Sequence, residues 1–294
     1  MVVGMPPLEH RVAAADGVSL CVFEWNAGAR GRDDTLVLAH ATGFHGRCWD
    51  QVVAHLDGRH VLAVDQRGHG RSDGTPPVDW RLFGRDLAEL MRAFDLRDAV
   101  GVGHSMGGHA TTEAAAAEPE RYRRLVLIDP VIGSPEAYVA GRRAAFADTP
   151  HPTAKRRARW PSPAEMLSRF RGRPPFDTWD PAVLRDYVEH GLLPDPAGKG
   201  WVLACDPAFE AEVYMNALEN AGVHDSVARV SAPVLVVRAK EPPSLRDRMD
   251  FRFSPTWPGL AGAFRHGREI RVPDRTHFVP MEDPAQVARW ILDG

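Results

Sequence analysis

Short runs of apolar residues recur along the chain and are separated by stretches whose apolar positions follow helical spacing. Two early runs flank Asp16-Gly17, a pair typical of a β-hairpin turn in which both turn positions take positive φ. The later runs have the length and composition of strands buried on both faces of a sheet. They cover residues 36–40, 60–65, 99–105, 124–129, 232–239 and 268–273.

Helical patterns lie between several of these predicted strands. Apolar residues follow helical spacing from Phe83 to Phe94, and an alanine-rich stretch covers residues 106–118. An amphipathic stretch covers residues 283–292, with proline near its start. Strands that alternate with helices indicate a mostly parallel central sheet with helices on both faces. The sequence therefore predicts an α/β fold.

This alternation stops after Gly133. Residues 134–225 show no clear strand pattern, are rich in Arg, Pro and Trp, and contain helical patterns at 164–171 and 207–221. We expect this segment to form a helical lid that is inserted into the core and covers the strand ends. The predicted core then comprises residues 1–133 and 226–294.

The segment Gly103-His104-Ser105-Met106-Gly107 ends one predicted strand and begins the alanine-rich helix. This is the context of a nucleophile elbow, in which a strained turn presents a serine hydroxyl clear of the sheet. The two glycines allow the strand and the helix to approach closely, which a serine that only capped the helix would not require. We predict that Ser105 is a nucleophile.

A histidine near the end of the chain fits the role of general base. His277 follows the last predicted strand and precedes the final helix, which gives the chain order serine, acid, histidine. A serine hydroxyl becomes an effective nucleophile when a neighbouring imidazole accepts its proton. We therefore predict that His277 activates Ser105.

Two carboxylates lie at strand ends where they could orient this histidine. Asp129 ends the predicted strand that follows the elbow helix, and Glu241 follows the run 232–239 directly. A carboxylate in this role holds the imidazole tautomer and stabilises the imidazolium. Placement in the fold favours Asp129, and Glu241 remains the alternative.

A glycine-containing loop follows the strand 36–40 and precedes Phe44. Acyl transfer needs two N–H donors aimed at the oxyanion of its intermediate. One donor is the backbone N–H that follows the nucleophile, here that of Met106, and the other comes from a loop after an earlier strand. Thr42 fits the second position, so we predict an oxyanion hole made by Thr42 and Met106.

Together these segments resemble the α/β-hydrolase family. The resemblance includes the LVLAHATGF loop, the GHSMGG elbow, the loop of His277, and Asp65–Ser72, which is similar to the family's D-x-R-G-x-G-x-S turn. It implies the α/β-hydrolase fold, with a structural role for Asp65 and Arg67. Serine at 105 argues against the chemistries of epoxide hydrolases and haloalkane dehalogenases, which resemble this chain but carry aspartate at the elbow.

Composition narrows the class of partner. With a net charge of −3, the chain has no overall attraction for nucleic acid or anionic membranes. It contains no apolar stretch long enough to cross a membrane and no secretory leader pattern. Its three scattered cysteines suit a reducing compartment and match no metal-binding spacing. We expect a cytoplasmic protein that acts on a small molecule without a metal or cofactor.

The predicted activity is cleavage of a carboxylic ester through an acyl-enzyme. Lactones, thioesters and activated C–C bonds are alternative substrates of the same residues. A cofactor-free perhydrolase or oxygenase and a ligand-binding receptor of the same fold are alternatives of other classes. The oligomeric state does not follow from the sequence.

Two features of the predicted lid bear on its substrate. The basic run from Lys155 to Arg159 has the composition of a solvated helix face, with attraction of an anionic substrate as the alternative. Aromatic residues are expected mainly to pack the lid on the core, with the lining of a hydrophobic pocket as the alternative. They are Trp160, Trp179, Trp201, Phe146, Phe170, Phe176, Phe209, Tyr138 and Tyr214.

Overall fold

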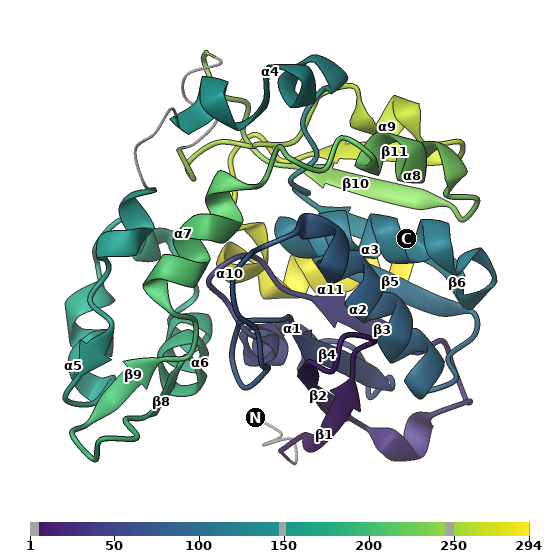
Figure 1. Ribbon diagram of the computed structural model, residues 1–294. Helices are drawn as coiled ribbons and strands as arrows, with labels where there is room; N and C mark the ends of the chain where they lie inside the picture. Colours follow the sequence, from purple (N-terminus) through teal and green to yellow (C-terminus); the bar gives the residue numbers. More distant parts are fainter. Residues whose placement is uncertain (1–5, 147–150, 245–249, 294) are drawn as a thin grey trace.

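The computed structural model describes residues 6–146, 151–244 and 250–293, without the side chains of 142–146. These residues form an eight-stranded sheet in the order β1-β2-β4-β3-β5-β6-β10-β11 (Figure 1). Strands β4 to β11 of this order pair in parallel, and β1 and β2 form an antiparallel edge. The strands span Leu8–Ala13 (β1), Ser19–Trp25 (β2), Leu36–Ala39 (β3), Val61–Asp65 (β4), Ala99–His104 (β5), Tyr122–Ile128 (β6), Val234–Arg238 (β10) and Gly267–Arg271 (β11).

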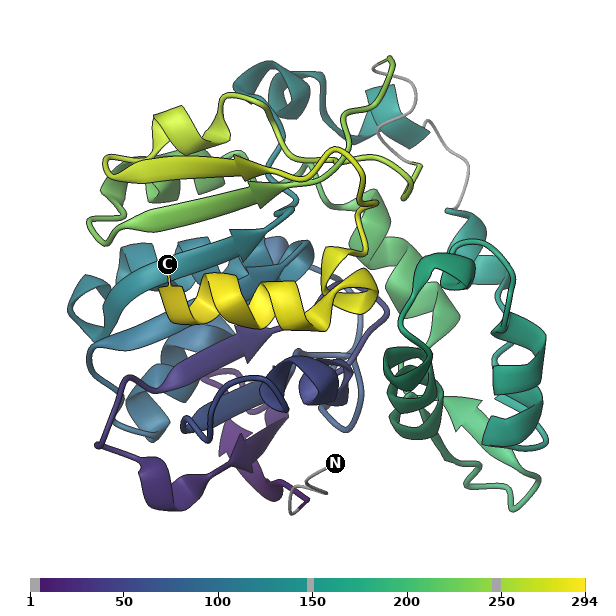
Figure 2. The ribbon, with the colours of Figure 1, turned by 180° about the vertical axis from the view of Figure 1, so that it is seen from behind.

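Helices cover both faces of the sheet. Along β3, Val37 and Ala39 pack with α2, α3 and α8, whereas Leu36 and Leu38 pack with α1 and α11 on the opposite face (Figures 1 and 2). Because both faces are covered at the centre of the sheet, β3 is apolar at every position, whereas the edge strands β1 and β11 carry exposed polar residues. The core helices span Asp50–Val53 (α1), Trp80–Ala93 (α2), Met106–Ala117 (α3), Val223–Arg229 (α8), Leu260–Ala263 (α9), Val279–Glu282 (α10) and Pro284–Asp293 (α11).

The fold class predicted from the sequence is confirmed, and each predicted apolar run falls on a strand. The hairpin at Asp16-Gly17 also forms, but its turn differs from the prediction. Only Gly17 of the pair has a positive φ, and its N–H donates to the Ala14 carbonyl at 2.9 Å. A turn over residues 14–17 that ends in a left-handed glycine is the longer type of hairpin connection.

The segment between β6 and α8 leaves the sheet and lies beside it (Figure 1). It contains the predicted helices, although the second ends at Met215 rather than at 221. The next residue, Asn216, uses its side-chain amide to bond the Val78 carbonyl at 2.8 Å. The lid helices span Pro135–Phe146 (α4), Pro163–Phe170 (α5), Pro181–His190 (α6) and Pro207–Met215 (α7).

The expectation that this segment lacks strands was wrong. Arg159–Trp160 (β7), Trp201–Leu203 (β9) and Leu192–Pro194 (β8) form a three-stranded antiparallel sheet in that order, counted over the described residues. Strands of two or three residues are too short to show an alternating pattern. The predicted lid boundary at 225 falls inside α8, which packs against α3 in the core. The division into core and lid otherwise remains a prediction.

Candidate active site

Ser105 occupies a sharp turn between β5 and α3. Its backbone has φ 57° and ψ −118°, a strained conformation for a residue other than glycine. A Cβ at Gly103 would lie 2.3 Å from the Gly107 carbonyl oxygen, and a Cβ at Gly107 would lie 2.1 Å from that of Ala39. Both glycines are therefore required by the packing of the turn, as the sequence predicts for an elbow.

His277 comes from the loop between β11 and α10 and reaches the serine hydroxyl. Its Nε2 lies 2.9 Å from Ser105 Oγ, and its Nδ1 lies 2.6 Å from Asp129 Oδ2. With the proton on Nδ1, the imidazole donates to Asp129 and accepts the hydrogen bond of Ser105. The His277 backbone N–H donates to the Phe251 carbonyl at 3.1 Å, which helps to fix the loop.

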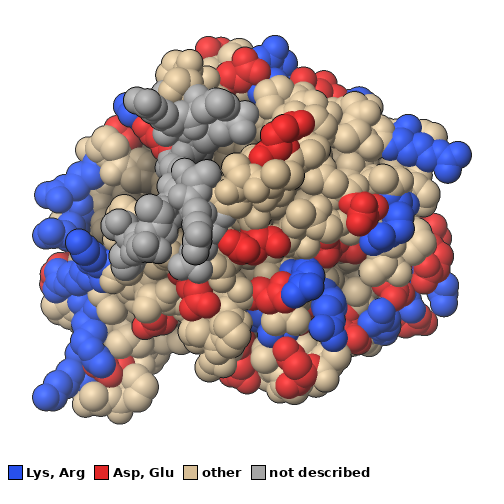
Figure 3. Space-filling view, turned by 45° about the horizontal axis from the view of Figure 1, so that its top comes forward, with Lys and Arg blue, Asp and Glu red and all other residues tan. Residues whose placement is uncertain are grey.

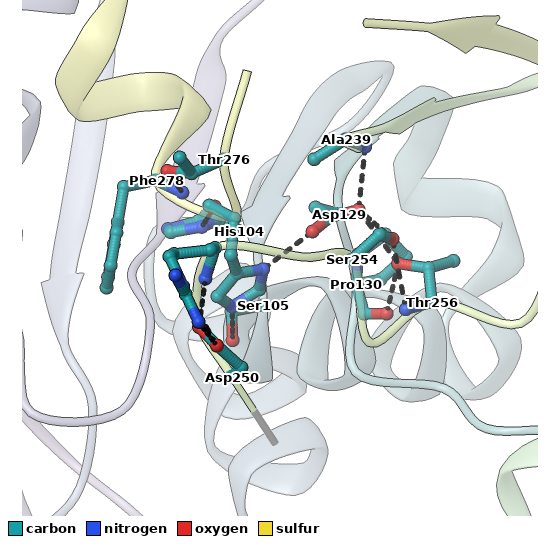
Figure 4. Close-up of polar contacts among 12 residues, drawn as sticks. His104, Ser105, Asp129, Pro130, Ala239, Asp250, Ser254, Thr256, Thr276 and Phe278 are labelled. Atoms are coloured by element: carbon teal, nitrogen blue, oxygen red, sulfur yellow. Dashed lines mark hydrogen bonds and ion pairs between the residues drawn. The ribbon is translucent and has the colours of Figure 1, made fainter. Parts of the chain in front are cut away.

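Asp129 follows β6 directly and is fully buried, with φ 45°. Its Oδ1 accepts hydrogen bonds from the Ala239 N–H at 3.0 Å, the Ser254 hydroxyl at 2.5 Å and the Thr256 hydroxyl at 3.3 Å (Figure 4). Its Oδ2 therefore faces His277 while Oδ1 is held by the other donors. The carboxylate is fixed from both sides.

The alternative acid, Glu241, lies elsewhere. Its carboxylate pairs with Arg238 at 2.8 Å and with Arg271 at 2.9 Å, and 47% of its side chain is exposed. The hydrogen bond from Arg238 lowers the pKa of Glu241. The structure therefore brings Asp129 to the imidazole and keeps Glu241 in a surface ion-pair cluster.

The two residues predicted for the oxyanion hole are in contact. The Thr42 hydroxyl lies 3.4 Å from Met106 Sδ, so the loop after β3 touches the first turn of α3. Neither the Thr42 N–H nor the Met106 N–H donates a hydrogen bond to another described residue. The Tyr214 hydroxyl donates to the Thr42 carbonyl at 3.4 Å and ties α7 to the same loop.

The Asp65–Ser72 turn has the structural role that was expected. Buried Asp65 accepts the N–H groups of Gly46 at 2.6 Å and Arg71 at 2.8 Å. The Arg67 guanidinium pairs with Asp86 at 2.6 Å and joins this turn to α2. These contacts anchor the end of the Thr42 loop and do not reach Ser105.

Several residues of the site were missed by sequence reasoning. The hydroxyls of Ser254 and Thr256, which hold Asp129, come from a proline-rich stretch without a recognisable pattern. His104 was visible inside the elbow motif. Its Nε2–H donates to the His277 carbonyl at 2.8 Å, and burial lowers its pKa well below the usual value. The neutral ring thus helps to position His277.

A cavity of about 490 Å³ lies between this site and the lid. Thr42, Phe251 and Phe278 line its inner wall, and the Phe251 ring stacks on His277 with 6.2 Å between centroids. Ser105 is only 4% exposed and does not itself line the cavity. The aromatic residues that reach the cavity from the lid are Trp160, Phe170, Phe176, Trp179, Tyr187 and Tyr214.

The remaining aromatic residues of the predicted lid lie elsewhere. Phe209 packs on Gly68 and His69, Tyr138 packs on His224, and Trp201 lines a separate surface hollow. The Phe146 side chain lies outside the described residues. Five residues of the set therefore line the cavity, whereas Phe209 and Tyr138 pack against other side chains.

Neither a metal cluster nor a membrane helix is found in the part of the chain that the structure describes. No group of three or more His, Cys, Asp or Glu side chains there is arranged to hold a metal ion. No helix there has the length and apolar character needed to cross a membrane. The three cysteines are buried and free.

The parallel sheet with a serine at the corner after β5 defines the class of α/β hydrolases. The sequence model of the alpha/beta hydrolase family matches residues 36–290, so the chain belongs to that family. It is 29% identical to "Lipase LipV" of Mycobacterium tuberculosis, over 86% of this chain and 89% of that protein.

Two further comparisons extend the likeness. The chain is 37% identical to "Non-heme chloroperoxidase" of Streptomyces lividans, over 41% of this chain and 44% of that protein. The solved structure of E-2-(acetamidomethylene)succinate hydrolase superposes with a TM-score of 0.74 at 22% identity and covers 98% of both chains. Family membership and the names of such relatives support hydrolytic activity in general.

Proposed function

We propose that this protein is a serine hydrolase that cleaves a carboxylic ester of a small molecule through an acyl-enzyme. The observation that carries the proposal is the continuous chain of hydrogen bonds from Ser105 Oγ through His277 to Asp129, at 2.9 and 2.6 Å. These distances and the order of the three groups match the requirements of nucleophilic catalysis by serine.

In the proposed reaction, Ser105 Oγ attacks the ester carbonyl while His277 Nε2 accepts its proton. The Thr42 and Met106 N–H groups stabilise the resulting oxyanion. The C–O bond to the alcohol then breaks, and the alcohol leaves with the proton from His277. Water attacks the acyl-enzyme by the same proton route in reverse and releases the acid and free Ser105.

Labelling with a fluorophosphonate probe, together with cleavage of short p-nitrophenyl esters, tests this proposal. We expect stoichiometric labelling and measurable turnover, and we expect both to disappear in Ser105→Ala. Ser231→Ala, which changes an exposed serine before β10, is the matched control and should keep both. Folded protein that neither labels nor cleaves any ester, lactone or thioester of a broad panel would instead support a ligand-binding role.

Perhydrolysis is the second candidate function, because the similarity to a chloroperoxidase covers part of this chain. In that reaction hydrogen peroxide replaces water in the attack on the acyl-enzyme and releases a peracid. The formation of peracid, measured by its oxidation of bromide, distinguishes perhydrolysis from hydrolysis. If peroxide does not compete with water for the acyl-enzyme, hydrolysis is the reaction.

A further inference from the structure

The basic run of the lid does not form a solvated helix face. Residues Pro152–Lys155 make one 3-10 turn, and the chain is extended at Arg156, with φ −61° and ψ 144°. Lys155, Arg156 and Arg157 all line the cavity described above, whereas Arg159 pairs with Asp195 outside it. Three consecutive cations therefore contribute to the cavity wall.

The cavity has more basic than acidic side chains among its described lining residues. The basic ones are Lys155, Arg156, Arg157 and Arg169, and the acidic one is Glu210. Within the described ranges, Lys155 and Arg169 take part in no ion pair, and the Arg157 pair with Glu165 is exposed on both sides. Arg156 is also paired, with Glu210, so the lining cations without an ion pair among the described residues are Lys155 and Arg169. Lys and Arg side chains also gather along the lid edge in Figure 3.

Arg156 is held in a defined position within this cavity. Its Nη1 donates to Glu210 Oε2 at 2.5 Å, and its Nη2 donates to the Tyr187 hydroxyl at 2.9 Å. Burial opposes its charge, but Tyr187 and Glu210 raise the pKa of Arg156 overall. The side chain therefore remains a cation, and it donates no other side-chain hydrogen bond to the described residues.

Glu210 places this cation next to the predicted oxyanion loop. The Glu210 side chain is 3% exposed, and a Cβ at Gly43 would lie 2.5 Å from its Oε1. Thr42 and Gly43 line the same cavity. An acyl group that extends from Ser105 past Thr42 and Gly43 into this cavity would therefore meet the Arg156 guanidinium and the other basic lining residues.

We infer that the cavity binds an acyl substrate whose acyl chain carries a carboxylate, recognised by Arg156 together with Lys155 and Arg169. The planar guanidinium matches a carboxylate, and the two other cations raise the local concentration of anions. The aromatic wall contacts the hydrocarbon part of the chain. This inference rests on the proposed function, because it names the substrate class of the same site.

Two esters of equal chain length test whether the cavity prefers an acyl chain that carries a carboxylate. Mono-p-nitrophenyl glutarate carries a carboxylate where p-nitrophenyl pentanoate carries a methyl group. We expect the ratio of their kcat/KM values to exceed about ten at low ionic strength and to fall as salt is added. In the double variant Lys155→Gln/Arg169→Gln this ratio should fall about tenfold.

The matched control is Arg171→Gln/Arg173→Gln. It makes the same change in net charge at two exposed lid residues that do not line the cavity. It should keep the activity on both esters. A wild-type ratio of one or less, or an equal fall in both double variants, would overturn the inference.

A binding measurement separates this inference from the proposed reaction. In Ser105→Ala, calorimetric titration with monomethyl glutarate and methyl pentanoate needs no turnover. We expect the anionic ester to bind more tightly and to lose this preference in the Lys155→Gln/Arg169→Gln background. If the wild type neither reacts with the fluorophosphonate nor turns over any ester of the panel, the proposed function fails, and this titration alone decides whether the cavity selects carboxylates.

Discussion

Replacement of Asp129 by Asn tests the proposed role of the carboxylate without removing its packing. Three of the four hydrogen bonds to Asp129, those from Ala239, Ser254 and Thr256, reach Oδ1. An asparagine keeps an oxygen at that position, so the fold should survive. Its amide nitrogen then replaces Oδ2 and faces His277 Nδ1.

An amide N–H donates to Nδ1 and moves the imidazole proton to Nε2. That nitrogen lies 2.9 Å from Ser105 Oγ and then can no longer accept the serine proton. Inversion of the tautomer lowers kcat about 10⁴-fold in a triad of this kind, or about 5 kcal/mol of transition-state stabilisation. Glu241→Gln, which changes only the surface ion pairs, should keep kcat within about twofold of wild type.

The assay is steady-state hydrolysis of a p-nitrophenyl ester, with circular dichroism to show that each variant is folded. Equal activities of the folded Asp129→Asn variant and the wild type would refute the reasoning about the tautomer. Loss of activity in Glu241→Gln with retention in Asp129→Asn would assign the acid to the other carboxylate.

Two predictions concern stability. Gly107→Ala should lower the free energy of unfolding in urea by about 3 kcal/mol, because the new Cβ meets the Ala39 carbonyl. Gly28→Ala, which places its Cβ in open space, should change that free energy little. Equal effects of the two substitutions would contradict this packing argument. Burial lowers the pKa values of His69 and His109 to about 4. Their contribution to the free energy of unfolding is therefore fully present above pH 6.5 and is lost as the pH falls toward 4. Each histidine should cost about 1 kcal/mol of stability between pH 6.5 and 5.5. Asp65, whose pKa burial raises to about 6, offsets part of this loss by becoming protonated. Thermal unfolding at pH 7 and 5.5 measures the balance, and His109→Gln should have the smaller decrease in Tm; an equal decrease in wild type and variant would contradict the assignment.

The parts of the fold that could be predicted are those with a local cause. The elbow at Ser105 requires glycine on both sides, and a central strand such as β3 needs apolar residues on both of its faces, so both leave a pattern in the sequence. Placement after β6 was enough to favour Asp129 over Glu241. The chain order then brought His277 to the same edge of the sheet.

The parts that could not be predicted depend on contacts between residues far apart in the chain. Ser254 and Thr256 hold Asp129 across more than a hundred residues, and no short motif marks them. The strands of the lid are too short for periodicity. The turn at Gly17 differs from the expected one because the same dipeptide suits hairpin loops of several lengths.

The chemistry proposed for this site depends on local sequence, whereas its proposed selectivity depends on contacts between residues far apart in the chain. The proposed acyl transfer depends on a turn whose geometry is set by nearby glycines, which many substrates can share. In the proposed binding mode, selectivity depends on Arg156, whose side chain is held by Glu210 of α7 and by Tyr187 of α6. A buried ion pair of this type contributes little net stability, since desolvation of both charges offsets their attraction. We therefore propose that the Arg156–Glu210 pair beside the predicted oxyanion loop serves recognition of a charged substrate, which the comparison of the two esters tests.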